Sequence, residues 1–207
     1  MWNAFSLWFL VVLVQCCLLF IDSKTYTIST IMGTGAAYTT GDNGPATAAT
    51  IYYASSVWQN TLYETFVAEA YSGCVRRINS ANIVNTYAGT CNNAGGGIYN
   101  YDNVQATLSN LYYPYTIYID STSKMFIADF YNNRIRSVAT SGIISTVAGG
   151  GTLNMDGISA ISALLVNPFS VWQSSTGVLY IGEYSGYRVR YVSGSIIYTL
   201  AGALLQI

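Results

Sequence analysis

Three stretches of the chain repeat one order of residue types, and this repetition constrains the fold more than any local feature does. The clearest copy is Met125–Gly151; Thr65–Cys91 aligns with it without a gap, and Leu179–Gly202 aligns with one residue dropped. Each copy holds an apolar pair, an acidic residue, a short turn, an alternating run with arginines, and a β-rich run that closes on Ala-Gly. Self-similarity at a period of about 55 residues predicts one structural unit used three times.

The pattern inside each copy predicts short antiparallel strands. Apolar and polar residues alternate, and turn residues separate the runs. A further strand is expected before each copy, and Pro114 and Pro168 precede two of these strands, where a missing amide hydrogen costs no ladder bond. The expected innermost strands are Ser55–Gln59, Tyr115–Ile119 and Phe169–Gln173, the expected four-stranded units are 51–89, 111–149 and 165–202, and a lone outer strand is expected at 26–32.

The residues that carry the repeat resemble those of a known family. Ile127–Arg136, the downstream Ile144–Gly149 and the upstream Gly41–Thr47 are similar to the NHL repeats of β-propellers, and the similarity extends from Tyr26 to Gly202. The resemblance implies an all-β fold, a β-propeller of four-stranded antiparallel blades, with about three blades present. It says little about activity, because one fold hosts many functions.

Three blades are fewer than the roughly 4 to 8 with which propellers close. Three explanations stay open. The sequence is a fragment or shortened product of a longer propeller, which its abrupt end at 204–207 favours; or two half-rings join into a six-bladed ring; or the arc persists and stacks with other arcs. The last two explanations predict self-association.

The N-terminal segment predicts export. Phe9–Phe20 is an apolar run of signal-peptide length, followed by the polar residues 22–24. We expect residues 1–23 to be a signal peptide, residues 24–207 to be the propeller domain, and the protein to be secreted and extracellular. The alternative is an uncleaved membrane anchor at residues 2–21, which approaches the ~20 residues of a membrane span.

Two cysteines lie inside the first unit. Cys74 opens the third strand and Cys91 follows the fourth, so the hairpin between them brings the two thiols close together. In an oxidising compartment this even pair predicts a disulfide. The alternative is two separate thiols.

Composition excludes several kinds of chemistry. The chain contains no histidine, which excludes Ser-His-Asp or Cys-His nucleophile systems and metal sites with histidine ligands. The same lack argues against the metal-dependent lyase of peptide amidation, an enzyme class with this resemblance. Net charge is −1, so no basic field for nucleic acid exists. Asp42, Asp102 and Asp156 each open a small polar segment, and one acid per segment favours a structural turn over a calcium loop; no cofactor is expected.

The repeated acids and arginines have two interpretations. They form a ring that grips an anionic ligand, or they tie neighbouring strands together inside each blade. Repetition favours the second interpretation, since a catalytic site is normally asymmetric whereas every unit needs its structural tie. The expected ties are Glu69 with Arg76, Asp129 with Arg134 and Arg136, and Glu183 with Arg188 and Arg190.

Aromatic residues supply the candidate contact surface. Trp58, Tyr118 and Trp172 occupy the same place in the three units, where they either stack on a ligand or fill the wedge between blades; the second role is favoured. The pairs Tyr52-Tyr53 and Tyr112-Tyr113 precede inner strands and are better candidates for exposed contacts.

The sequence therefore predicts a noncatalytic protein- or glycan-binding or scaffolding module, secreted or held at the cell surface. Two alternatives are kept. One is a structural subunit of an extracellular assembly or fibre, which low charge and an unclosed arc favour. The other is a hydrolase or lyase that uses carboxylates and a divalent ion, which requires acids from several blades to converge.

Overall fold

A computed structural model describes residues 28–202. The chain divides into two compact units, Met1–Thr30 and Ile31–Ile207, and every strand of the described part belongs to the second unit. The expected signal peptide at 1–23 lies outside the described residues. In the described part, no helix has the length and hydropathy that a membrane crossing requires.

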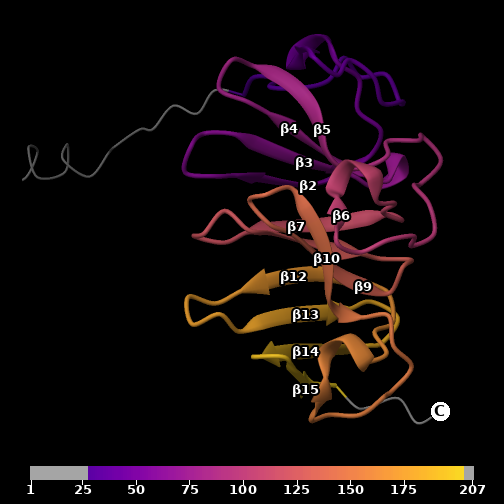
Figure 1. Cartoon of the computed structure of the whole chain (residues 1–207). Helices are drawn as coiled ribbons and strands as arrows, with labels where there is room; N and C mark the ends of the chain where they lie inside the picture. Colours follow the sequence, from indigo (N-terminus) through magenta and orange to yellow (C-terminus); the bar gives the residue numbers. More distant parts are fainter. Residues whose placement is uncertain (1–27, 203–207) are drawn as a thin grey trace, which may run out of the picture. The chain divides into compact units, whose positions relative to one another are not determined.

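Three five-stranded antiparallel sheets follow one another along the second unit, as Figure 1 shows from indigo to yellow. We call them blades 1, 2 and 3. Blade 1 contains β1 (Gly44–Pro45), β2 (Ala54–Gln59), β3 (Thr65–Glu69), β4 (Cys74–Ile78) and β5 (Ile83–Gly89). Blade 2 contains β6 (Val104–Gln105), β7 (Pro114–Ile119), β8 (Met125–Asp129), β9 (Arg134–Val138) and β10 (Ile143–Gly149). Blade 3 contains β11 (Ile158–Ser159), β12 (Pro168–Gln173), β13 (Leu179–Glu183), β14 (Arg188–Ser193) and β15 (Ile196–Ala201).

The same strand order occurs in every blade and confirms the predicted all-β repeat. Four successive strands pair in an up-and-down order, for example β2-β3-β4-β5, and the innermost strands β2, β7 and β12 pack side by side. The structure adds a two-residue fifth strand to each blade, which pairs with the outermost strand. Each fifth strand leads into a short 3-10 helix, η1 (Ala46–Ala48), η3 (Ala106–Leu108) or η4 (Ala160–Ser162); another, η2 (Ala70–Ser72), joins β3 to β4.

The outer hairpins turn at residues suited to a left-handed backbone. Asn82 between β4 and β5 has φ +61°, and Gly142 and Gly194 at the matching turns have φ +81° and +62°. Glycine and asparagine adopt this conformation at less cost than other residues. These turns join the two outer strands of each blade, and the turn of blade 3 is one residue shorter than the other two.

The apolar core lies between successive blades. One cluster joins Phe66, Ala68 and Val75 of blade 1 to residues of blade 2 such as Ile117 and Met125. A second cluster joins Phe126, Ala128 and Ile135 of blade 2 to Val171, Leu179 and Ile181 of blade 3. Because each sheet buries one face against the next sheet, the arrangement is stabilised mainly by packing between the blades.

One predicted element is wrong. Residues 28–32, the described part of the expected outer strand at 26–32, contain no strand, and Ile28 is fully exposed. The equivalent strands β5, β10 and β15 each pair with an inner neighbour of their own blade, whereas segment 28–32 pairs with no strand in the described part. Met32 instead packs its side chain with Ala46 and Ala49 beside blade 1.

Candidate functional site

A buried carboxylate at the end of the second inner strand holds two segments of each blade together. In blade 2, Asp129 accepts a hydrogen bond from the backbone amide of Tyr112 at 2.7 Å. Nη1 of Arg136 lies 3.5 Å from Oδ2 of Asp129, and Nη2 of Arg136 lies 2.8 Å from Oδ1 of Asp102. We call this carboxylate–arginine–aspartate arrangement the polar tie.

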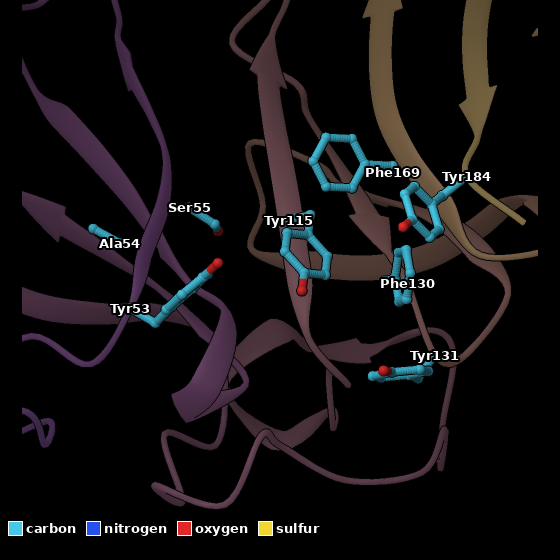
Figure 2. Close-up of a pocket in the computed structure, with 8 residues that line it drawn as sticks. All are labelled: Tyr53, Ala54, Ser55, Tyr115, Phe130, Tyr131, Phe169 and Tyr184. Carbon is cyan, nitrogen blue, oxygen red and sulfur yellow. The ribbon is translucent and has the colours of Figure 1, made fainter.

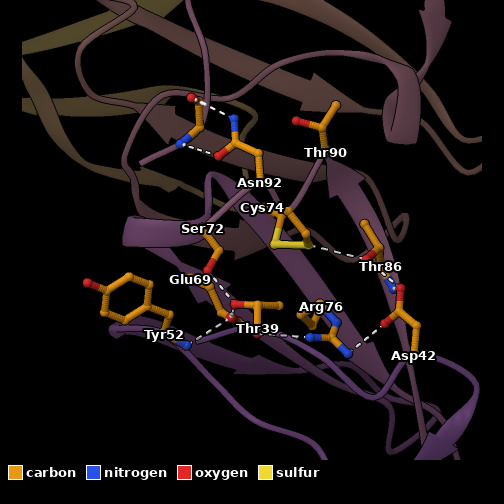
Figure 3. Close-up of a disulfide and its surroundings, with 12 residues drawn as sticks. Thr39, Asp42, Tyr52, Glu69, Ser72, Cys74, Arg76, Thr86, Thr90 and Asn92 are labelled. Carbon is orange, nitrogen blue, oxygen red and sulfur yellow. Dashed lines mark hydrogen bonds and ion pairs between the residues drawn. A yellow bond between two sulfur atoms is a disulfide. The ribbon is translucent and has the colours of Figure 1, made fainter. Parts of the chain in front are cut away.

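Blade 1 contains the same tie (Figure 3). Glu69 accepts a hydrogen bond from the amide of Tyr52 at 3.1 Å, and Arg76 lies 3.4 Å from Glu69 and 2.6 Å from Asp42. The hydroxyl of Thr39 donates a second hydrogen bond to Glu69. The Asp42 carboxylate therefore contacts Arg76 of β4. It also accepts hydrogen bonds from the backbone amide and the hydroxyl of Thr86 in β5, so it links its own turn to two strands of the blade.

Blade 3 adds a second arginine to the tie. Glu183 accepts a hydrogen bond from the amide of Val166 at 3.1 Å. Nε of Arg188 lies 3.0 Å from Oε1 of Glu183, and Nη1 of Arg190 lies 3.6 Å from the same oxygen. Arg190 also reaches Asp156 at 3.2 Å.

Arg134 corrects the predicted set of ties. It was expected to pair with Asp129, but its Nη1 donates to the carbonyl of Asn132 at 2.7 Å, and its guanidinium lies 3.9 Å from the centre of the Tyr99 ring. The Asn132 amide instead donates to Oδ2 of Asp129 at 3.0 Å. Aspartate is one methylene shorter than the glutamate of blade 3. Asp129 accepts a hydrogen bond from Asn132, whereas Glu183 pairs with Arg188.

Burial raises the pKa of the tie carboxylate in blades 1 and 2. It raises the pKa of Asp129 from 3.8 to about 6, although the Tyr112 amide and Arg136 oppose the shift. The pKa of Glu69 is also raised by burial, against the hydrogen bonds from Thr39 and Tyr52 and the charge of Arg76. Burial, followed by the neighbouring Arg188, lowers the pKa of Arg190. The ties thus place charges inside the blades at an electrostatic cost.

Cys74 and Cys91 form a disulfide next to the tie of blade 1 (Figure 3). Their Cα atoms are 5.0 Å apart, and the bond joins the start of β4 to the segment just after β5. Cys74 occupies the position that Arg134 and Arg188 occupy in the other blades. The disulfide therefore fixes the end of the outer hairpin in blade 1.

The polar ties position a continuous cluster of aromatic rings. Each tie carboxylate holds the segment before an inner strand, and in blades 1 and 2 this segment carries Tyr52-Tyr53 or Tyr112-Tyr113. The turn after each tie carboxylate carries Tyr71, Phe130-Tyr131 or Tyr184. Neighbouring rings lie 4.8–6.5 Å apart between centroids along this cluster. We call it the aromatic basin, and its rings are Tyr52, Tyr53, Tyr71, Tyr112, Tyr113, Tyr115, Phe130, Tyr131, Phe169 and Tyr184.

A cavity of about 470 Å³ opens within the aromatic basin. Figure 2 shows Tyr53 and Ser55 on one side of it and Tyr115 with four further rings on the other. The lining is Tyr53, Ala54, Ser55, Tyr115, Phe130, Tyr131, Phe169 and Tyr184, and none of these side chains is charged at neutral pH. Partial burial, and then the neighbouring tyrosines, raise the pKa of Tyr115 further. Ring faces and hydroxyl groups are therefore the chemistry that the cavity offers.

The sequence pointed to only part of the basin. Tyr53 lines the cavity, and Tyr52, Tyr112 and Tyr113 lie in the adjoining rings. The residues missed are Tyr71, Tyr115, Phe130, Tyr131, Phe169 and Tyr184. A signal for three of them was available, because a tyrosine stands one or two residues after each tie carboxylate, at positions interpreted only as turns.

Trp58, Tyr118 and Trp172 lie outside the aromatic basin, toward the far ends of the inner strands. The rings of Trp58 and Tyr118 are 4.9 Å apart, and those of Tyr118 and Trp172 are 6.4 Å apart, so both contacts join adjacent blades. Trp58 and Tyr118 are half-buried against the two core clusters, whereas Trp172 is 51% exposed. This placement fits filling between blades more than a shared ligand platform.

Solved structures place this architecture in a known fold. An auxiliary nutrient binding protein from Bacteroides ovatus matches with a TM-score of 0.53 and 16% identity, over 70% of this chain and 37% of its own. A chain of the nidogen/laminin complex matches with a TM-score of 0.50 and 13% identity, over 72% and 48%. The chain is a β-propeller by fold. Virginiamycin B lyase from Staphylococcus aureus also matches, with a TM-score of 0.48 and 13% identity, over 70% and 40%.

These matches establish the fold alone. This chain spans less than half the length of each of the three matched structures. No protein-family model matches the sequence, and no curated protein matches it. At 16% and 13% identity, the nutrient binding protein and the nidogen/laminin chain do not decide the function of this propeller.

Proposed function

We propose that this chain is a secreted, noncatalytic propeller of the NHL type that binds an uncharged segment of another protein in the aromatic basin. A single observation carries the proposal: rings from all three blades converge around one cavity that has no charged side chain in its lining. Tyrosine is favoured at protein-binding surfaces because it gives a large, rigid contact area together with a hydroxyl.

The positions of the acidic residues support a noncatalytic role. An ion-dependent hydrolase or lyase would need carboxylates directed into one cavity. Glu69, Asp129 and Glu183 are instead buried, and each is paired with an arginine of its own blade. Among the described residues, no group of three histidine, cysteine or acidic side chains is placed to hold a metal ion.

The disulfide supports export, because structural disulfides persist in oxidising compartments. The order of residues around Ile127–Arg136 supports the NHL assignment. The aromatic basin crosses three blades, so an extended peptide that contacts several rings suits it better than one compact group. Proline-rich segments are the best-known partners of aromatic-lined grooves, since their extended conformation is already formed before binding.

Calorimetric titration with a short, uncharged proline-rich peptide tests the proposal. The peptide is expected to bind saturably, and Tyr115→Ala should weaken binding at least about tenfold, since Tyr115 contacts both Phe130 and Phe169. Tyr63→Ala is the matched control, because Tyr63 is exposed in the β2–β3 turn and outside the cavity lining.

A neutral oligosaccharide is titrated in parallel. Saturable binding of the oligosaccharide alone, with the same loss in Tyr115→Ala, would make a glycan the ligand in place of a peptide. If neither probe binds, or if both tyrosine variants bind as the wild type does, the aromatic basin is not the binding site.

A further inference from the structure

A second cavity, of about 240 Å³, opens beside the outer strands β9 and β10 of blade 2. Its lining includes Tyr99, Asp102, Arg134, Thr146, Gly150 and Ile161, and none of its lining residues belongs to the aromatic basin. The two charged side chains, Asp102 and Arg134, distinguish it from the uncharged cavity of the basin. Since its volume is below the roughly 300–1,000 Å³ of pockets for drug-sized ligands, it suits a smaller molecule.

Arg134 brings a positive charge to this cavity in a fixed orientation. Its Nη1 donates to the carbonyl of Asn132 at 2.7 Å, and its guanidinium lies 3.9 Å from the centre of the Tyr99 ring. A Cβ atom at Gly150 would lie 2.5 Å from Nε, so the guanidinium needs glycine there. Arg134 forms no ion pair with an acidic side chain in the described part of the chain, and its Nε and Nη2 donate to none of the described residues. These two atoms form the planar edge with which arginine binds a carboxylate.

Asp102 brings the opposite charge to the same cavity. Its Oδ1 lies 2.8 Å from Nη2 of Arg136 and accepts a hydrogen bond from the hydroxyl of Thr146 at 3.2 Å. Its Oδ2 accepts no hydrogen bond from a described residue, and the side chain is partly exposed. In blade 1, by contrast, both carboxylate oxygens of the equivalent Asp42 have partners. Blade 2 therefore leaves one carboxylate oxygen available to a ligand.

The other two blades use the same place differently. In blade 1 the disulfide replaces the arginine, and its Cys91 sulfur lies 3.2 Å from the hydroxyl of Thr86, the equivalent of Thr146. In blade 3 Arg188 is already paired with Glu183 at 3.0 Å. Among the described blades, blade 2 alone combines an unpaired guanidinium with a carboxylate in one cavity. A structural tie is needed in every unit, so a feature of one unit favours ligand binding.

We propose that this cavity binds a free α-amino acid with an apolar side chain. Nε and Nη2 of Arg134 donate to the carboxylate of the ligand, and Asp102 accepts a hydrogen bond from its ammonium group. Tyr99 and Ile161 provide apolar surface for its side chain. An α-amino acid carries both charges on one carbon, so it matches both charged groups of the cavity and adds no net charge to it. A simple anion or a simple cation would match only one of the two.

Calorimetric titration of the purified protein with L-leucine tests the proposal. Leucine is expected to bind saturably. N-acetyl-L-leucine lacks the ammonium group and L-leucinamide lacks the carboxylate, so each should bind at least about tenfold more weakly, as expected for the loss of one hydrogen bond between charged groups. A wild type that does not bind leucine would overturn the proposal. Equal binding of either analogue would overturn the pairing of both ligand charges.

Variants of Arg134 locate the site. Arg134→Gln should weaken leucine binding at least about tenfold, and Arg134→Lys, which keeps the charge but loses the planar edge, should weaken it less. Arg77→Gln is the matched control, because Arg77 also lies over a tyrosine ring, at 5.9 Å from the centre of Tyr87, but outside the cavity. Circular dichroism checks that every variant is folded. Unchanged leucine binding in both folded Arg134 variants would place the ligand elsewhere and overturn the proposal.

Discussion

Blades 2 and 3 place a carboxylate at the same point but surround it differently. Asp129 in blade 2 has one arginine and the neutral amide of Asn132 as partners. Glu183 in blade 3 has two arginines, Arg188 and Arg190. The repeat therefore determines where the carboxylate lies and which backbone amide it holds, but it does not determine how the negative charge is compensated. Equivalent positions in a repeat protein are not equivalent electrostatically.

Removing the tie arginine should produce the largest effect, and the effect should differ between the two blades. Arg136→Met leaves Asp129 buried without a cation, and we expect it to lower the free energy of unfolding by about 3–5 kcal/mol. Arg190→Met leaves Glu183 paired with Arg188 at 3.0 Å, so we expect a loss of only about 1–3 kcal/mol. Urea unfolding followed by circular dichroism measures both losses.

Methionine retains the length of arginine in both variants, so the two losses are matched for packing. Equal losses would show that the second arginine of blade 3 does not replace the first. A larger loss for Arg190→Met would reverse the comparison.

The disulfide extends the comparison to blade 1. Cys74 stands where Arg134 stands in blade 2, and the Cys74–Cys91 bond closes a loop with a sequence separation of 17. Replacing both cysteines by alanine should cost roughly 3 kcal/mol, because the unfolded chain regains the entropy of that loop. Arg134→Ala loses an interaction with the Tyr99 ring and should cost about 0.5–1 kcal/mol.

Thermal unfolding of the two variants under non-reducing conditions compares these costs. A double cysteine variant as stable as the wild type would show that the tie of blade 1 holds the hairpin without the bond. A larger loss of stability in Arg134→Ala would show that the arginine stabilises its blade more than the disulfide stabilises blade 1.

The pH dependence of stability should show a small effect. Because burial raises the pKa of Asp129 from 3.8 to about 6, the folded state binds this proton more tightly than the unfolded state. The resulting stabilisation is fully present below the unfolded pKa and is lost as pH rises through the folded pKa. Between about pH 5 and about pH 7, Asp129 should therefore remove roughly 1 kcal/mol from the free energy of unfolding.

Asp129→Asn isolates this contribution from the other carboxylates, including Glu69, whose shift has the same sign. Urea unfolding of both proteins at the two pH values gives the difference between wild type and variant. That difference should decrease as pH rises. An increase with pH would mean that attraction to Arg136 outweighs burial and that the pKa of Asp129 is depressed.

The fold was predictable because its evidence is repeated three times along the chain. The alternation within each copy and the prolines before the inner strands were enough to predict the four longer strands of each blade. The two-residue fifth strands were not predictable, since a pair such as Gly44–Pro45 carries no periodic signal. The strand expected at 26–32 is not present at residues 28–32. Its residue pattern is that of a strand, but the described part of the chain offers it no pairing partner.

The candidate site was predicted less completely, for a geometric reason. Tyr53 and Tyr131 come from different blades, and Tyr53 shares a cavity with Phe169 although more than half of the described chain separates the two. Only the side-by-side packing of β2, β7 and β12 brings these segments to one place. A single sequence shows which positions recur, but which recurring positions share a surface depends on the folded arrangement.

The polar ties have a consequence for how such a chain changes length. Asp42, Arg76 and Glu69 all come from one stretch of the polypeptide, and the same holds for the corresponding residues of blades 2 and 3. Duplication or loss of one whole stretch would therefore leave no buried charge without its partner. Only the fit between apolar faces would need to adapt, so genes of this kind can gain or lose modules without dismantling the electrostatics of those that remain.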